Sequence, residues 1–197
     1  MNKAVFLDRD GVINELVYHQ EQEVIDSPFT VKQFSLKEGV AETIKTLTQA
    51  GYLTVVVSNQ PGIAKGQMSQ EIFNAIGHKM NRELNLKGAC LDGEYYCLHH
   101  PEALLEEYKN NCDCRKPKPG LILQAAKEMD IELQQSWMIG DNISDIQAGK
   151  SAGCRTILIG RMKCTVCQRM DDLSVYPEFI ANKLFDSSQI ILKGVII

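Results

Sequence analysis

The sequence lacks the features typical of membrane, secreted and nucleic-acid-binding proteins. No apolar stretch in its 197 residues approaches the length that a membrane-spanning helix requires. The formal net charge is −4, and lysine and arginine form no stripe that would bind a nucleic-acid backbone. The chain runs from Met1 almost directly into an apolar strand, so we expect no signal peptide. We therefore expect a cytoplasmic protein with no membrane or nucleic-acid partner.

The cysteine content does not indicate a disulfide framework. The chain has 7 cysteines, an odd number, and no secretory signal, so reduced thiols or metal ligands are expected. The hydrophobic fraction of 44% and the charged fraction of 23% are ordinary for a globular protein that buries a core. We find no sequence repeat and no linker, so residues 1–197 are expected to form one domain.

A short apolar run near the N-terminus ends in two carboxylates. Residues 4–7 are too few for a helix and too apolar for a loop, which predicts a buried parallel strand. Asp8 and Asp10 then project to one side, at the strand end where open α/β sheets place their ligands, and Arg9 projects elsewhere. Two like charges so close favour a metal ion between them. A strand end capped by Asx turns is the alternative.

The rest of the chain alternates between helical and strand-like patterns. Helical spacing runs from about 36 to 50, 69 to 84, 120 to 129 and 142 to 152, and apolar runs predict strands at 53–57, 91–97, 137–139 and 156–159. Residues 15–35 are interpreted as a polar, irregular loop. The tail contains a short helical patch near 177–184 and an apolar run at 190–197. This alternation predicts an α/β fold with one doubly wound, mostly parallel sheet.

Three of the predicted strands end in polar residues that can share one site. The first ends at Asp8, the second at Ser58 and a later one at Asp141, and the carboxyl ends of parallel strands lie on one edge of a sheet. Arg115 and Lys116 in a proline-braced loop add positive charge. The set is suited to phosphoryl transfer, in which a carboxylate attacks phosphorus, Mg²⁺ binds carboxylates and phosphate, and a lysine and a hydroxyl offset charge.

The motifs around these residues resemble the four motifs of the haloacid-dehalogenase superfamily of phosphatases, in the same order, from residue 4 to about 155. They are Phe-Leu-Asp-Arg-Asp-Gly-Val (6–12), Val-Ser-Asn (57–59), Lys116 and Gly-Asp-Asn-Ile-Ser-Asp (140–145). Three stretches, at 8–14, 58–66 and 112–117, are also similar to the heptose-bisphosphate phosphatases that supply heptose for lipopolysaccharide. The resemblance implies a Rossmann-like, haloacid-dehalogenase-type sheet.

This resemblance implies a Mg²⁺-dependent phosphatase that removes the 7-phosphate of D-glycero-D-manno-heptose 1,7-bisphosphate through an aspartyl-phosphate. Histidinol phosphate or another small sugar phosphate is the alternative substrate. The catalytic residues implied are the nucleophile Asp8, the general acid and base Asp10, and the phosphoryl-binding Ser58 and Lys116. The Mg²⁺ ligands implied are Asp8, the Asp10 carbonyl and Asp141. The substrate-binding residues implied are Arg9, Leu16, His19, Asn59, Gln60, Arg115 and Asn142.

The fourth motif departs from the superfamily at one position, because Asn142 follows Asp141 where the resemblance implies a lysine. An asparagine donates a hydrogen bond but brings no charge. Asp145 lies one helical turn beyond Asp141 and has two interpretations. It orients water molecules on the metal, or it stabilises the positive end of the helix dipole.

Two pairs of metal-ligating residues flank a loop that contains prolines. Cys97 and His99 are two apart, as are Cys112 and Cys114, so each pair points to one side of an extended chain. Three thiolates and one imidazole fill a tetrahedral Zn²⁺ shell, which predicts a structural site. The loop leads into Lys116, so we expect the zinc to hold this lysine in place. Unrelated buried cysteines are the alternative.

The gaps between the motifs leave no room for an independent cap domain. They hold two helices, a strand and loops, so we expect an open site whose specificity comes from short loops. We also expect a monomer that acts on a small phosphorylated sugar. Cys164 and Cys167 have no second pair to complete a zinc site and are interpreted as packing or loop residues. A non-catalytic, zinc-stabilised binding protein is the alternative from another functional class.

Overall fold

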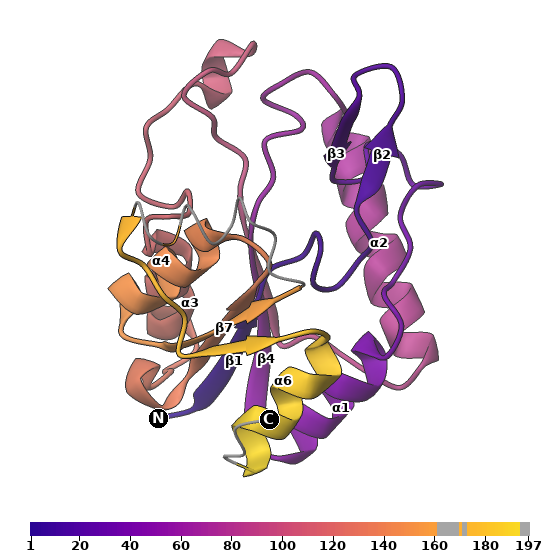
Figure 1. The fold of residues 1–197 in the computed structure, drawn as a ribbon. Helices are drawn as coiled ribbons and strands as arrows, with labels where there is room; N and C mark the ends of the chain where they lie inside the picture. The colour runs from indigo at the N-terminus through magenta and orange to yellow at the C-terminus, as the bar shows by residue number, and fades with distance from the viewer. Residues whose placement is uncertain (161–169, 171–172, 194–197) are drawn as a thin grey trace.

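The computed structural model describes residues 1–160, 170 and 173–193, and its centre is a six-stranded sheet (Figure 1). The strand order is β5-β4-β1-β6-β7-β8, and every neighbouring pair is parallel. The strands are β1 (Lys3–Leu7), β4 (Tyr52–Asn59), β5 (Gly93–Cys97), β6 (Trp137–Gly140), β7 (Arg155–Ile159) and β8 (Phe179–Ala181). Cys164, Cys167 and the end of the final apolar run lie outside the described residues.

Helices cover both faces of this sheet. They are α1 (Val40–Gln49), α2 (Gln70–Leu86), α3 (Gly120–Glu128), α4 (Ile143–Ala152) and α6 (Leu184–Lys193), with 3-10 turns η1 (Glu106–Tyr108) and η2 (Leu133–Gln135). Val5 and Leu7 of β1 share a core with α1, α2 and α6, whereas Ala4 and Phe6 share one with α3 and α4. The predicted doubly wound parallel α/β fold is confirmed, with β1 between β4 and β6.

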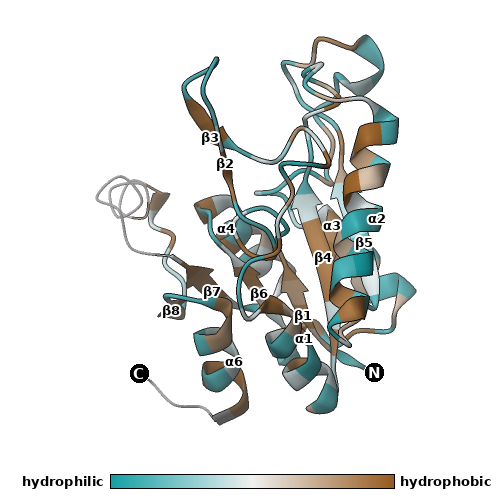
Figure 2. Cartoon of the chain, turned by 90° about the vertical axis from the view of Figure 1, so that its right-hand side faces the viewer, coloured by the Kyte–Doolittle hydropathy of each residue, from teal (hydrophilic) through white to brown (hydrophobic). Residues whose placement is uncertain are grey.

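The segment after the first motif is more ordered than predicted. Within residues 15–35, β2 (Val17–His19) and β3 (Val24–Asp26) form an antiparallel hairpin, so the irregular loop is a wrong prediction. Strands of three residues are too short to give a periodicity signal. The hairpin and the loop that carries η1 both project beyond the end of the sheet where β1 stops (Figures 1 and 2). They therefore border the edge at which the motif residues gather.

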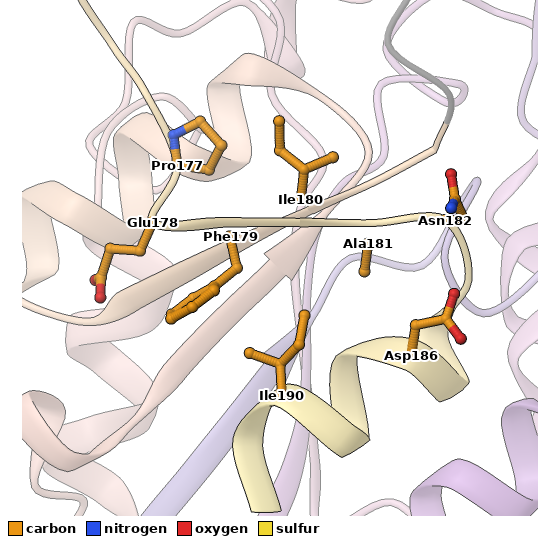
Figure 3. A pocket seen from close by; sticks show the side chains of 8 residues that line it. All are labelled: Pro177, Glu178, Phe179, Ile180, Ala181, Asn182, Asp186 and Ile190. Atoms are coloured by element: carbon orange, nitrogen blue, oxygen red, sulfur yellow. The ribbon is translucent and has the colours of Figure 1, made fainter. Parts of the chain in front are cut away.

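The tail also differs from the prediction. Residues 179–181 form β8, which pairs in parallel with β7, and the helix begins only at Leu184, so the expected helical patch at 177–184 is wrong. Phe179 and Ala181 point to the side where Ile190 of α6 lies, whereas Ile180 points away (Figure 3). The pocket drawn there is lined by residues 177–182, 186 and 190, none of which belongs to the four motifs.

Two further boundaries have simple causes. The first helix begins at Val40 and not near 36, because Gly39 has a φ of 79°, outside the right-handed helical region. The predicted strand 91–97 begins at Gly93, where pairing with β4 starts. Among the residues that the structure describes, no helix is long and apolar enough to cross a membrane.

Candidate active site

Asp8 lies directly beyond the end of β1, in the middle of the sheet. Its backbone N–H donates to the carbonyl of Ile139 in β6 (3.0 Å), and its Oδ1 accepts from the backbone N–H of Arg9 (2.7 Å). The same oxygen lies 3.0 Å from Nζ of Lys116, and the side chain keeps 13% of its surface exposed. The carboxylate is therefore held on one side and open on another, as a nucleophile requires.

Lys116 is a buried cation that links three segments of the site. Its Nζ donates to the carbonyl of Val57 (2.9 Å) and pairs with Asp8 (3.0 Å) and Asp145 (2.6 Å). Burial alone would lower the pKa of Lys116, but the charges of Asp145 and Asp8 raise it above its ordinary value. The lysine is therefore protonated, and it places a positive charge beside the Asp8 carboxylate.

Three carboxyl groups form a cluster around this lysine. Oxygens of Asp8, Asp141 and Asp145 lie within 4.8 Å of one another. Burial, followed by the charges of Asp8 and Asp145, raises the pKa of Asp141 to about 8. Burial also raises the pKa of Asp145, to about 6, although the charge of Lys116 opposes the shift. One ammonium does not balance three carboxylates, so the donor set fits Mg²⁺, which binds carboxylate oxygens.

Asp145 has a contact that neither sequence-based interpretation includes. The side chain is fully buried, and one oxygen pairs with Lys116 while the other accepts the backbone N–H of Asn142 (3.0 Å). Asn142 is exposed and is the N-cap of α4, with its own side chain accepting from Ser144. The spacing Asn-x-x-Asp is a capping-box signal that could have placed the second oxygen. The ion pair with Lys116 joins distant segments, and no local signal predicts it.

Gly11 makes room for Asp141. It has a φ of 80°, and a Cβ at this position would overlap the carboxyl group of Asp141. Glycine meets both conditions without strain, because it has no Cβ and adopts positive φ readily. The chain turn after the first motif therefore brings the fourth motif close to Asp8.

We expect Gly11→Ala to weaken Mg²⁺ binding roughly tenfold or more, because the new methyl group displaces the Asp141 carboxylate. Calorimetric titration with Mg²⁺ measures the effect. Gly39→Ala is the matched control, since Gly39 has a φ of 79° and its Cβ would meet no atom within 4 Å. Equal Mg²⁺ affinities in the two variants would contradict the placement of Asp141 at the metal.

The end of β4 brings two predicted site residues to the same edge. Ser58 is 1% exposed, and its hydroxyl oxygen accepts from Nε2 of Gln60 (3.1 Å). The side-chain amide of Asn59 makes two hydrogen bonds with the backbone of Lys116, donating to its carbonyl and accepting from its N–H, each at 3.0 Å. In this geometry Asn59 holds the segment that carries the lysine, whereas the sequence predicts it to bind substrate.

The other predicted substrate-binding residues lie in different environments. Arg9 is fully buried and pairs with Asp10 (3.1 Å), and Leu16 is 42% exposed. His19 is 7% exposed, its Nε2 lies 2.9 Å from the carbonyl of Ser27, and its ring stacks on Phe29. His19 is therefore engaged within its own segment, and the structure does not bring it into the carboxylate cluster.

The four predicted zinc ligands form a second cluster. The Cys114 sulfur lies 3.2 Å from that of Cys97, 3.0 Å from that of Cys112 and 3.5 Å from Nδ1 of His99, and the four ligand atoms lie within 4.8 Å of one another. Ligands about 2.3 Å from a tetrahedral Zn²⁺ are separated by about 3.7 Å, whereas a disulfide requires about 2 Å. The donor set and its spacing therefore fit Zn²⁺. His100 is not part of the cluster, and its Nδ1 accepts a hydrogen bond from the backbone N–H of Glu102.

The cysteine cluster adjoins the catalytic edge directly. The backbone N–H of Gln60 donates to the carbonyl of Cys97 (2.7 Å), and Nη1 of Arg115 donates to the carbonyl of His99 (3.2 Å). Cys114 lies two residues before Lys116. A metal bound by these ligands would therefore join the end of β5 to the segment that supplies the lysine.

Comparison with known proteins agrees with this geometry. A family model described as "HAD-hyrolase-like" matches residues 113–187, which contain the lysine and the fourth motif. The sheet, the aspartate beyond its central strand and this match place the chain among the phosphoric monoester hydrolases of the haloacid-dehalogenase type.

The relatives define the family more narrowly. The chain is 44% identical over 160 residues to the D-glycero-beta-D-manno-heptose-1,7-bisphosphate 7-phosphatase of Pasteurella multocida, covering 81% of this chain and 82% of the relative. It is 36% identical over 190 residues to the enzyme of that name from Escherichia coli K12, covering 96% and 94%. The crystal structure of D,D-heptose 1,7-bisphosphate phosphatase from B. bronchiseptica, complexed with magnesium and phosphate, has a TM-score of 0.79 at 29% identity and covers 98% of this chain and 99% of that one. The chain belongs to this heptose-bisphosphate phosphatase family, as its motifs predict.

Proposed function

We propose that this protein hydrolyses the 7-phosphate of D-glycero-D-manno-heptose 1,7-bisphosphate through an aspartyl-phosphate on Asp8. The observation that carries the proposal is the contact between Asp8 and the buried Lys116, beside the carboxylate cluster at the end of β1. The names of the relatives supply the substrate, which the geometry alone does not define. The product belongs to heptose supply for lipopolysaccharide.

The first step forms the covalent intermediate. An oxygen of Asp8 bonds to phosphorus as the bond from phosphorus to the C7 oxygen breaks, and Asp10 gives its proton to that leaving oxygen. Lys116 and the hydroxyl of Ser58 bind the non-bridging oxygens of the phosphoryl group. The products of this step are the heptose 1-phosphate, with a free C7 hydroxyl, and phosphorylated Asp8.

The second step regenerates the enzyme. A water oxygen bonds to phosphorus while the bond to Asp8 breaks, and Asp10 takes a proton from that water. Inorganic phosphate leaves, and Asp8 and Asp10 return to their starting states. The same carboxyl group thus serves as acid and then as base, so its orientation must suit both steps.

The carboxylates of Asp8 and Asp141 and the backbone carbonyl of Asp10 would hold Mg²⁺. When bound, Mg²⁺ offsets the negative charge of Asp8 and of the phosphoryl oxygens. Lys116 remains necessary beside it, because its ammonium also holds the Asp145 carboxylate, which supports the start of α4. The shortage of positive charge around Asp141 supports this assignment.

Arg115 is proposed to bind the distal phosphate of the substrate. Burial lowers the pKa of His100, and the charges of Arg115 and Lys65 lower it further, so both cations act on His100 in the zinc loop. Such a group attracts a phosphate that is not being cleaved. We also propose that the protein is a monomer of the cytoplasm, where a reducing environment suits a zinc site of three thiolates.

A phosphate-release screen tests the proposed function. The substrates are both anomers of heptose 1,7-bisphosphate, histidinol phosphate and simple sugar phosphates, and ³¹P NMR identifies which phosphate is lost. Preferential release from C7 of the heptose supports the proposal. Preference for histidinol phosphate would assign the related enzyme activity instead. No release from any substrate by folded, metal-loaded protein would favour the non-catalytic binding protein.

A further inference from the structure

The carboxylate of Asp10 is held by three neighbouring side chains. Its Oδ1 accepts from Nδ2 of Asn14 (2.9 Å) and from Arg9 (3.1 Å), and its Oδ2 accepts from Arg9 (3.1 Å) and from Nε2 of Gln60. Each carboxylate oxygen therefore has its own side-chain amide donor, and Arg9 bridges the two. This arrangement fixes the rotation of the carboxyl group about its Cβ–Cγ bond.

Gln60 links this carboxylate to the rest of the site. Its Nε2 also donates to the hydroxyl of Ser58 (3.1 Å), and its Oε1 accepts from Nη2 of Arg9 (2.6 Å). One amide group thus contacts the predicted acid and base, the phosphoryl-binding hydroxyl and a buried cation. Among the described residues, Gln60 is the only one outside residues 9–14 that donates a hydrogen bond to the Asp10 side chain.

The exposed fractions of these side chains indicate which of them can contact the substrate. The Arg9 side chain and Asn14 are fully buried, and Gln60 is 2% exposed, whereas the Asp10 side chain keeps 13% of its surface exposed. The Arg9 guanidinium also lies 5.9 Å from the ring centres of Phe73 and Tyr96, which favours a cation there. Asp10 is therefore the member of this group that reaches the open side of the site.

We propose that Gln60 is a positioning residue that holds the Asp10 carboxyl group in one orientation, with Asn14 as the second donor to Asp10. The inference rests on the proposed function, because it assumes that Asp10 is the general acid and base. It also changes the role expected from the sequence, in which Arg9 and Gln60 bind substrate.

This role makes a prediction about the leaving group. A sugar alkoxide leaves only when it is protonated, whereas p-nitrophenolate leaves without a proton, so a misplaced general acid slows the first reaction selectively. In Gln60→Met, which keeps the side-chain length and removes the polar contacts with Asp10, Ser58 and Arg9, kcat for heptose 1,7-bisphosphate is expected to fall roughly 30-fold with KM within about threefold. For p-nitrophenyl phosphate, kcat is expected to fall less than about threefold.

The controls separate misfolding from mispositioning. Gln124→Met makes the same change at an exposed position of α3 and is expected to leave both activities unchanged. Thermal unfolding and calorimetric binding of beryllium fluoride with Mg²⁺, a phosphoryl mimic that needs Asp8 but no general acid, report on the fold and the rest of the site. If Gln60→Met does not fold, Asn14→Ala provides the same test through the donor on Oδ1.

Two results would overturn the inference. An equal loss with both substrates would mean that Gln60 acts on the phosphoryl group or on the fold, and a raised KM with unchanged kcat would return it to substrate binding. Asp10→Asn separates the positioning role proposed for Gln60 from the catalytic role proposed for Asp10. If Asp10→Asn shows the leaving-group selectivity and neither Gln60→Met nor Asn14→Ala does, the inference alone fails. If Asp10→Asn lacks it, the proposed role of Asp10 fails as well.

Discussion

Asp8→Asn is expected to lower kcat by roughly 10⁴-fold or more, because an amide oxygen does not form the phospho-enzyme. The fold should be retained. The backbone contact of Asp8 with Ile139 does not involve the side chain, an amide oxygen can still accept from Arg9, and Lys116 keeps its partner Asp145. Phosphate release and thermal unfolding measure the two effects, and mass spectrometry of acid-quenched turnover detects the phosphorylated aspartate in the unaltered protein.

Asp130→Asn is the control for this substitution. Its side chain is 75% exposed and lies near the N-terminal amine, and its φ of 52° is a conformation that asparagine tolerates well. This variant should keep full activity. Substantial turnover by Asp8→Asn, or phosphate trapped on another residue, would refute the assignment of the nucleophile.

Removal of zinc is expected to cost roughly 100-fold in kcat, because a displacement of Lys116 by about 1 Å is enough for a loss of that size. In Cys114→Ser the ligand two residues before the lysine is lost, and metal analysis should show less than one zinc per chain. The loop between the ligand pairs should become sensitive to protease, since it holds few buried apolar side chains. A strong chelator should have the same effect even when Mg²⁺ is restored, and added Zn²⁺ should reverse it.

Cys90→Ser is the matched control, since Cys90 is an exposed thiol outside the zinc cluster. It should retain its zinc content, its protease resistance and its activity. Zinc-free protein that turns over at the normal rate would show that Asn59, which binds the backbone of Lys116 on the other side, is sufficient to place the lysine.

The strands of the sheet could be predicted because burial on both faces produces continuous apolar runs, as in β1, β4 and β6. The short strands could not. β8 has three residues, and its alternation becomes visible only beside α6 and β7. The hairpin of β2 and β3 has the same size limit. An element of three residues is defined by its partner and hardly by its own sequence.

The sequence likewise predicts some features of the candidate site and misses others. The placement of Asp8, Ser58 and Asp141 at one edge follows from strand ends in a parallel sheet, and the cluster of three cysteines and one histidine follows from two short spacings. The hydrogen-bond and ion-pair partners of the site residues could not be predicted from the sequence. Asp145 binds Lys116 across 29 positions of sequence, and Gln60 binds Asp10 across 50. Hydrogen bonds between distant segments leave no periodic signal.

The sequence by itself determined which chemical groups this protein can use, because residue type and local spacing decide what a strand end or a cysteine pair can bind. Only the tertiary structure decided how those groups are supported. A buried charge or amide must find a partner wherever the fold brings one near, since an unpaired polar group costs free energy. That requirement pairs Lys116 with Asp145 and joins Arg9, Asn14 and Gln60 around Asp10. Arg9 and Gln60, which the sequence predicts to bind substrate, therefore contact the Asp10 carboxylate instead.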